Sequence, residues 1–156
     1  MKNVFYYQTE LGVIGIADNG AAITDVFFGQ EAAPKELVEK ETPLIKKAIT
    51  EIKEYLAGKR TSFDLPLEMK GTDFQKATWQ ALLTIPYGET RSYKQIAEQI
   101  GRPKACRAIG MANNRNPISI IVPCHRVIGA NGSLVGYGGG LELKARLLSL
   151  EKANKS

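Results

Sequence analysis

The chain has 156 residues, of which 44% are apolar and 24% charged, a composition typical of a folded protein and not of a disordered one. No apolar run approaches the roughly 18 residues that span a bilayer, and the first residues lack the apolar core of a signal peptide, so we expect a cytoplasmic protein without membrane contact. Two cysteines and one histidine are too few for a secreted disulfide framework or a structural zinc site, so no metal is expected.

The net charge of +5 is unevenly distributed along the chain. Residues 1–65 carry a net charge of −2, whereas residues 66–156 carry +7. A basic half suits contact with a polyanion, because each neutralised phosphate releases condensed counterions. Charge alone leaves the alternative of a basic surface that serves only solubility equally open.

The N-terminal part is predicted to form a small antiparallel sheet covered by a helix. Three runs rich in Val, Ile, Phe and Tyr lie between residues 4 and 29, and Asn19-Gly20 between the last two favours a tight type I′ hairpin turn. Over residues 42–57 apolar side chains recur at helical spacing. An extended connector follows, and we place the domain boundary after residue 65.

The C-terminal part is predicted to be mostly helical. Two Ser/Thr-x-x-Gln capping boxes, at Thr72 and Ser92, begin helices that end near Pro86 and at Gly101. A further short helix is expected over residues 105–114, and two short helices joined by a glycine-containing turn form a helix-turn-helix pattern. Such a pattern binds DNA or forms a plain structural corner, and the pattern alone does not separate the two.

The second helix of this pattern is basic and lined by small side chains. The cations on or beside it are Arg102, Lys104, Arg107 and Arg115, and the small residues include Ala105, Ala108 and Gly110. Small side chains let a helix backbone come close to a ligand. Since only Arg107 is a long cation well inside the helix, we expect weak reading of base edges, which argues against a small transcription regulator.

The only histidine directly follows one of the two cysteines, in the stretch IIVPCHRVIG. We expect residues 118–122 to form a buried strand that Pro123 ends before Cys124. A lone Cys after an apolar strand is more often a packing residue than a nucleophile, and His125 by itself is more often structural. Their joint position where a strand opens into a turn favours a nucleophile with its base.

The last predicted helix, residues 140–152, carries Glu151 beside apolar positions. Glu151 is either an exposed charge near the helix end or the third member of a Cys–His–Glu relay. The glycine-rich NGSLVGYGGG before this helix contains Tyr137 and lacks the spacing of a phosphate loop. A lid over a flat ligand suits it better.

Three motifs of the C-terminal part resemble the active-site signature of the O6-alkylguanine-DNA alkyltransferases, single-use repair proteins for alkylated guanine. They are RAIGMANNRNP, PCHRV and GYGGG, and the similarity extends over residues 72–152. The resemblance implies an α+β fold with a small N-terminal antiparallel sheet and a helix, ribonuclease H-like, over residues 1–65. A mostly helical domain with the helix-turn-helix would then occupy residues 66–156.

The resemblance also implies a role for each residue of the reactive site. Cys124 would take the alkyl group from guanine O6, His125 would act through a water as its base, and Glu151 would hold the imidazole. Asn116 would tie the helix-turn-helix to the turn that bears Cys124. Tyr93 would contact the flipped guanine and help to neutralise the departing ring.

Further residues would bind the DNA, which the resemblance implies to be double-stranded, alkylated at guanine and contacted in its minor groove by a monomer. Arg107 would replace the extruded base in the stack, and the small residues of its helix would allow the close approach. Tyr137 would form part of the pocket wall, and backbone groups at Val127 and Gly138 would hold the edge of the base. Many relatives carry Ser at the position of Gly138, so a hydroxyl contact is not expected there.

The chemistry implied by the resemblance needs few parts. Methyl transfer from an ether oxygen to sulfur requires a thiolate, a stabilised guanine anion and a base taken out of the duplex, but no separate cofactor. The thioether product has no easily displaced group, which predicts one turnover per molecule.

Two other functions remain as alternatives. A lesion-binding protein without transfer would lack the reactive cysteine that is present here as Cys124. A cysteine hydrolase built on Cys124 and His125 would leave the helix-turn-helix and the uneven charge without a purpose.

Overall fold

The computed structural model describes residues 2–29, 36–133, 137 and 140–155. The chain forms two compact units, one of Met1–Met69 with Pro117–Ile121 and one of Lys70–Asn116 with Val122–Ser156. The domain boundary expected after residue 65 stays a prediction. Among the described residues no helix combines the length and apolar character needed to cross a bilayer.

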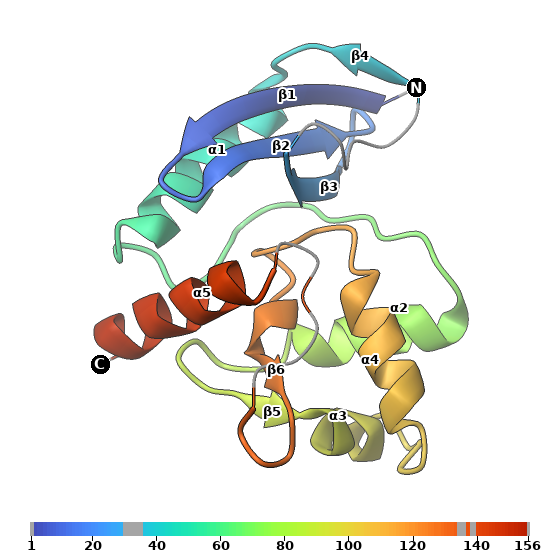
Figure 1. Cartoon of the computed structure of the whole chain (residues 1–156). Helices are drawn as coiled ribbons and strands as arrows, with labels where there is room; N and C mark the ends of the chain where they lie inside the picture. The colour runs from blue at the N-terminus through green and yellow to red at the C-terminus, as the bar shows by residue number, and fades with distance from the viewer. Residues whose placement is uncertain (1, 30–35, 134–136, 138–139, 156) are drawn as a thin grey trace. The chain divides into compact units, whose positions relative to one another are not determined.

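The first unit is built on a four-stranded sheet with the strand order β3-β2-β1-β4 (Figure 1). Its strands are β1 (Lys2–Thr9), β2 (Gly12–Asp18), β3 (Ile23–Phe28) and β4 (Leu37–Glu39). The first three form the expected antiparallel meander, whereas β4, which was not expected, pairs parallel to β1. The predicted helix, α1 (Pro43–Leu56), packs on this sheet and buries Ile45, Ile49 and Ile52.

The turn between β2 and β3 differs from the predicted tight hairpin. A type I′ turn needs positive φ at both central residues, and Asn19 is not among the residues with positive φ. Its Oδ1 instead accepts hydrogen bonds from the backbone N–H groups of Ala21 and Ala22. The type I′ prediction is therefore wrong, because the short Asn side chain offers the backbone a local partner that widens the turn.

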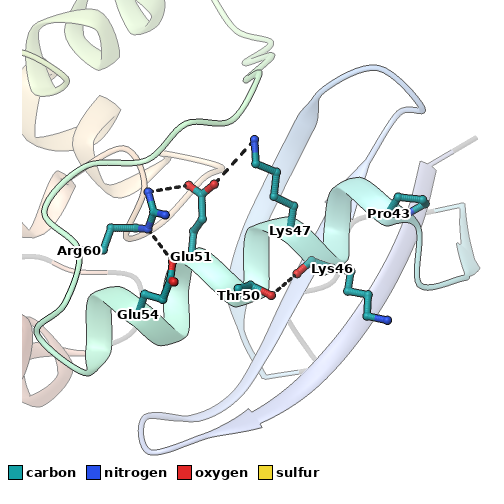
Figure 2. A pocket seen from close by; sticks show the side chains of 7 residues that line it. All are labelled: Pro43, Lys46, Lys47, Thr50, Glu51, Glu54 and Arg60. Carbon is teal, nitrogen blue, oxygen red and sulfur yellow. Dashed lines mark hydrogen bonds and ion pairs between the residues drawn. The ribbon is translucent and has the colours of Figure 1, made fainter.

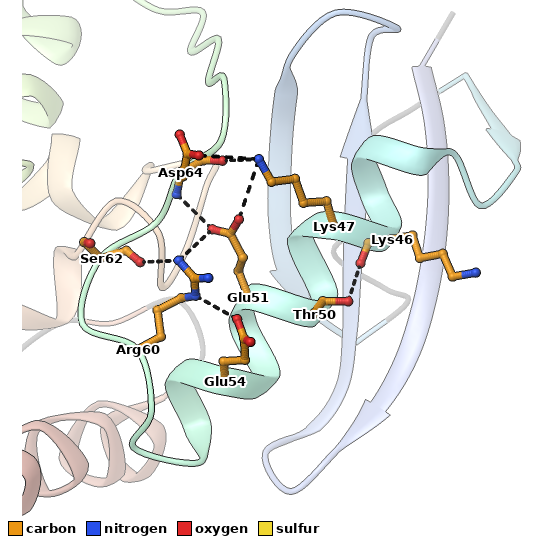
Figure 3. Close-up of polar contacts among 8 residues, drawn as sticks. All are labelled: Lys46, Lys47, Thr50, Glu51, Glu54, Arg60, Ser62 and Asp64. Carbon is orange, nitrogen blue, oxygen red and sulfur yellow. Dashed lines mark hydrogen bonds and ion pairs between the residues drawn. The ribbon is translucent and has the colours of Figure 1, made fainter.

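The connector after α1 is attached to that helix by the carboxylate of Glu51, which is only 3% exposed. Glu51 Oε1 accepts a hydrogen bond from the Asp64 N–H at 2.8 Å (Figure 3). The guanidinium of Arg60 lies 3.5 Å from Glu51 and 2.9 Å from the more exposed Glu54, and Lys47 Nζ lies 3.9 Å from Glu51. An open pocket beside α1 is lined by four of these residues together with Pro43, Lys46 and Thr50 (Figure 2).

The described part of the second unit is mainly helical, as expected. Its helices are α2 (Asp73–Leu82), α3 (Tyr93–Gln99), α4 (Cys106–Asn114) and α5 (Leu141–Asn154). Both capping boxes form, since Thr72 and Ser92 each exchange two hydrogen bonds with the glutamine three residues later. The indole N–H of Trp79 on α2 donates to the Ala112 carbonyl of α4 at 2.9 Å, so α2 supports the helix-turn-helix formed by α3 and α4.

Residues 118–122 do not form the predicted strand. Ile118 makes one isolated bridge to Val26 of β3. Ile120 has φ +72°, and the Ile121 N–H donates to the Ser119 carbonyl, which makes a γ-turn centred on Ile120. The apolar side chains of this segment are buried as expected, but the strand prediction is wrong because burial of an apolar run does not require a strand ladder.

We predict that Glu51→Ala lowers the free energy of unfolding by about 1–3 kcal/mol, because it leaves the Asp64 N–H and the Arg60 guanidinium without their buried acceptor. The matched control Glu54→Ala removes an exposed partner of the same arginine and should cost less than about 1 kcal/mol. Urea unfolding followed by circular dichroism measures both. Equal effects of the two substitutions would contradict an anchoring role for Glu51.

Candidate active site

Cys124 begins a single 3₁₀ turn, Cys124–Arg126, directly after a sharp bend. Pro123 has φ −81° and ψ 64°, and the Cys124 N–H donates to the Val122 carbonyl, which is an inverse γ-turn. The ring of proline holds φ near this value, so the bend is locally favoured. Cys124 therefore lies in a tight turn and not at a strand end as predicted, and it is 4% exposed.

Two asparagines at the C-terminal end of α4 hold this bend. Asn116 Nδ2 donates to the Val122 carbonyl at 2.8 Å, and Asn113 Nδ2 donates to the Cys124 carbonyl at 3.2 Å. The two acceptors lie on either side of Pro123, so the helix-turn-helix is attached to the reactive turn at both ends of the bend. Asn116 lies where the sequence predicted it. Asn113 was missed because an asparagine near a helix end is an ordinary terminating residue.

A short parallel ladder joins the start of the helix-turn-helix to the end of the reactive turn. It pairs β5 (Arg91–Ser92) with β6 (Val127–Ile128). Tyr93 directly follows β5, and burial together with the nearby charge of Cys124 raises the pKa of its hydroxyl. Its ring lies against Gly110, where an added Cβ would be 3.7 Å away. Strands of two residues have no detectable periodicity, so the sequence did not reveal this ladder.

Glu151 is buried and binds His125. Its carboxylate is 1% exposed, which excludes the alternative of a surface charge at the helix end. His125 Nε2 lies 2.6 Å from Glu151 Oε2, and the Gly88 N–H donates to Glu151 Oε1 at 3.1 Å. When Nε2 donates to a carboxylate, Nδ1 is the nitrogen of the ring that can accept a proton.

Arg126, for which the sequence suggested no role, binds the same carboxylate. Its Nε donates to Glu151 Oε1 at 2.8 Å and its Nη2 to Glu151 Oε2 at 3.0 Å. Nη1 donates to the Ile85 carbonyl at 2.7 Å, and the ring of Tyr87 lies 5.7 Å from the guanidinium carbon. The arginine thus connects α5, the reactive turn and the segment after α2.

Lys144, in the first turn of α5, is a second buried cation that the sequence analysis did not single out. Its Nζ donates to the Val127 carbonyl at 2.6 Å, which occupies one lone pair of the group expected to hold the base. Burial lowers the pKa of Lys144, and the charge of Cys124 opposes that shift. The spacing of Lys144, Leu147 and Glu151 on one helical face was the available signal, because a lysine in line with buried positions is itself expected to be buried.

The electrostatics of the site favour an uncharged pair of Cys124 and His125. Burial raises the pKa of Cys124 to about 11, while a hydrogen bond from Asn116 and the charge of Lys144 act in the opposite direction. Burial also lowers the pKa of His125, against the opposing effect of Glu151. At neutral pH the sulfur is therefore a thiol, and the neutral imidazole beside it can act as a base.

The outer face of α4 carries the predicted DNA-binding side chains. Arg107, Ala108 and Met111 of this helix are exposed, as are Arg102, Lys104 and Arg115 just outside its ends, whereas Ala105 and Gly110 are half-buried. Ile109 and Ala112 are buried on the opposite face. Met111, at 57% exposure, adds an unexpected large apolar side chain beside Arg107 and Ala108.

Two predicted residues belong to the glycine-rich segment before α5. Tyr137 is half-buried, and its place in a pocket wall stays a prediction. Gly138 lies outside the described residues, as does much of the predicted lid.

Comparison with known proteins assigns both parts of the chain to one family. Residues 4–69 match the ribonuclease-like domain of 6-O-methylguanine DNA methyltransferase, and residues 73–153 match its DNA binding domain. The chain therefore belongs to the 6-O-methylguanine DNA methyltransferase family, and the predicted α+β fold is confirmed.

Individual relatives are similar over nearly their whole length. The methylated-DNA–protein-cysteine methyltransferase of Mycobacterium leprae is 51% identical over 93% of this chain and 89% of its own. That of Methanosarcina acetivorans is 58% identical over 93% and 95%. The crystal structure of Mycobacterium tuberculosis OGT in complex with DNA superposes with a TM-score of 0.92 and 46% identity, covering 97% of this chain and 94% of that chain.

We predict a histidine-dependent loss of stability in mild acid. Burial lowers the pKa of His125 in the folded protein from its ordinary 6.5, so the unfolded chain takes up a proton first as the pH falls below 6.5. This contribution to stability is complete above pH 6.5 and is lost below it, by no more than about 1.4 kcal/mol per pH unit. Urea unfolding between pH 7.5 and 5 should therefore show a steeper decline for the wild type than for His125→Gln; parallel curves would contradict a buried neutral imidazole.

Proposed function

We propose that the protein repairs DNA by transferring a methyl or other alkyl group directly and irreversibly from guanine O6 to the sulfur of its own Cys124. The observation that carries the proposal is the buried thiol in a tight turn beside a histidine held by a buried carboxylate. Membership of the 6-O-methylguanine DNA methyltransferase family supports the same reaction. A lesion-binding protein without transfer would have no use for this arrangement of Cys124, His125 and Glu151.

In the proposed reaction His125 accepts the thiol proton through a water, and Glu151 stabilises the imidazolium that forms. The sulfur–carbon bond forms while the carbon–O6 bond breaks, and guanine keeps the electron pair. Tyr93 lies beside the reactive turn, where its hydroxyl can donate a proton to the departing guanine. Guanine and a thioether are the products, so each molecule reacts once and no cofactor is needed.

The proposed partner is double-stranded DNA that carries an alkylated guanine. Because the reactive atom is enclosed in the duplex, the base must leave the stack to reach Cys124. We place the exposed face of α4 in the minor groove, with Arg107 filling the position of the extruded base and Ala105, Ala108 and Gly110 permitting the approach. We further propose that the protein acts as a monomer, because one lesion reacts with one thiol. We also propose that it works in the cytoplasm.

Transfer should be visible as a mass gain of one methyl group on the peptide that contains Cys124 after incubation with duplex DNA carrying O6-methylguanine. Cys124→Ser should show no gain, and Cys106→Ser, which removes the other thiol of the chain, should react as the wild type does. Duplexes with O4-methylthymine test the breadth of the reaction. An unmodified Cys124 with a persisting lesion would refute the proposal, and repeated turnover would favour a hydrolytic enzyme.

Arg107→Ala should slow transfer from duplex DNA by roughly 10-fold or more, because extrusion of a base costs a few kcal/mol that the inserted side chain offsets. Reaction with free O6-benzylguanine, which needs no extrusion, should be unchanged. Arg115→Ala serves as control, since Arg115 is an exposed cation at the C-cap of the same helix and is not proposed to enter the base stack. Equal losses of Arg107→Ala with both substrates would exclude the proposed insertion.

A further inference from the structure

The Arg126–Glu151 pair is more than a packing contact, because the same carboxylate also binds the base of the site. Glu151 Oε2 accepts from Arg126 Nη2 at 3.0 Å and lies 2.6 Å from His125 Nε2. All three side chains are buried. Charges this close and this poorly solvated influence one another more strongly than charges at the surface do.

A buried carboxylate by itself would favour the protonated imidazole. An unneutralised anion next to a histidine stabilises the imidazolium, and the imidazolium would then hold the proton that the site must be ready to accept. Arg126 opposes this effect with a positive charge on the same two oxygens. The arginine therefore lets Glu151 orient the ring without converting His125 into a cation.

We propose that Arg126 is a positioning residue that neutralises Glu151 and thereby keeps His125 uncharged until the Cys124 proton is transferred. This inference rests on the proposed function, because it concerns the readiness of the same base. It gives a role to Arg126, for which the sequence suggested none.

The proton balance of the transfer step agrees with this role. In the resting site the proton is on sulfur and the imidazole is neutral. During transfer that proton moves to His125, and the imidazolium is then a salt-bridge partner of Glu151 beside Arg126. The overall reaction consumes no proton, since guanine finally takes up one proton for the one released by the thiol.

The charged and titratable groups around His125 come from α5 and the reactive turn. From α5 these are Glu151 and Lys144, and the reactive turn adds Arg126 and Cys124. The buried side chains of α2, which also packs on this turn, are all non-ionisable: Thr78, Trp79, Ala81 and Leu82. Glu151 is thus the only one of these groups that favours protonation while the thiol is uncharged, and the charge of Arg126 acts directly on it.

A single histidine in the chain makes the test direct. In protein labelled with ¹⁵N-histidine, NMR titration reports His125 alone and needs no substrate. Arg126→Met should raise the pKa of His125 by about 1 unit or more relative to the wild type, whereas Arg126→Lys, which keeps the charge, should leave it near the wild-type value. The acid limb of the rate of reaction with O6-benzylguanine should move to higher pH in Arg126→Met by a similar amount.

Two further variants keep the test decisive if Arg126→Met does not fold. Glu151→Gln leaves the Arg126 charge uncompensated and should lower the pKa of His125. The double variant Arg126→Met/Glu151→Gln removes both charges and should return that pKa toward the wild-type value, without burying an unpaired ion. A His125 pKa that is the same in every variant would overturn the proposal. Because the titration uses no DNA, that result is distinct from a failure of alkyl transfer itself.

Discussion

The buried carboxylate of Glu151 is the group on which the reactive site depends. An ionised carboxylate removed from water is tolerated only with partners that replace its hydration, and here they come from two segments, the reactive turn and the segment after α2. The Gly88 N–H, the guanidinium of Arg126 and the imidazole of His125 converge on its two oxygens. Because α5 can bury Glu151 only when these groups are in place, the same interactions that satisfy the charge also orient the imidazole of His125.

The reactive turn is held by backbone acceptors as much as by side-chain chemistry. The bend at Pro123 directs the Val122 and Cys124 carbonyls toward α4, where Asn116 and Asn113 bind them. The β5–β6 ladder and Lys144 hold the segment after the turn. Cys124 therefore has a defined position although it lies in no regular strand. Such support suits the transfer proposed for Cys124, since the rate of that step depends on how well the resting geometry places the reacting groups.

The two faces of α4 have different roles: one packs inside the protein, and the other is proposed to bind DNA. Its buried face, with Ile109, Ala112 and Asn113, packs toward α2, α3 and the reactive turn. Its exposed face carries Arg107 and Met111. A single helix thus connects the surface proposed to meet DNA with the bend that positions the thiol. This connection gives a physical reason why recognition and chemistry occupy one compact unit of the chain.

Local sequence determined the helices, because capping boxes, helical periodicity and glycine or proline at the ends act within a few residues. It also determined Cys124, His125 and Asn116 as candidates through the motifs that contain them, and Glu151 through its place beside the apolar positions of the last helix. Tertiary structure alone decided that residues 118–122 bend instead of forming a strand and that β4 joins the sheet. It also decided that Arg126 and Lys144 are buried beside the thiol. These features depend on which distant groups supply hydrogen bonds and exclude water, and neighbouring residues in the sequence carry no record of that.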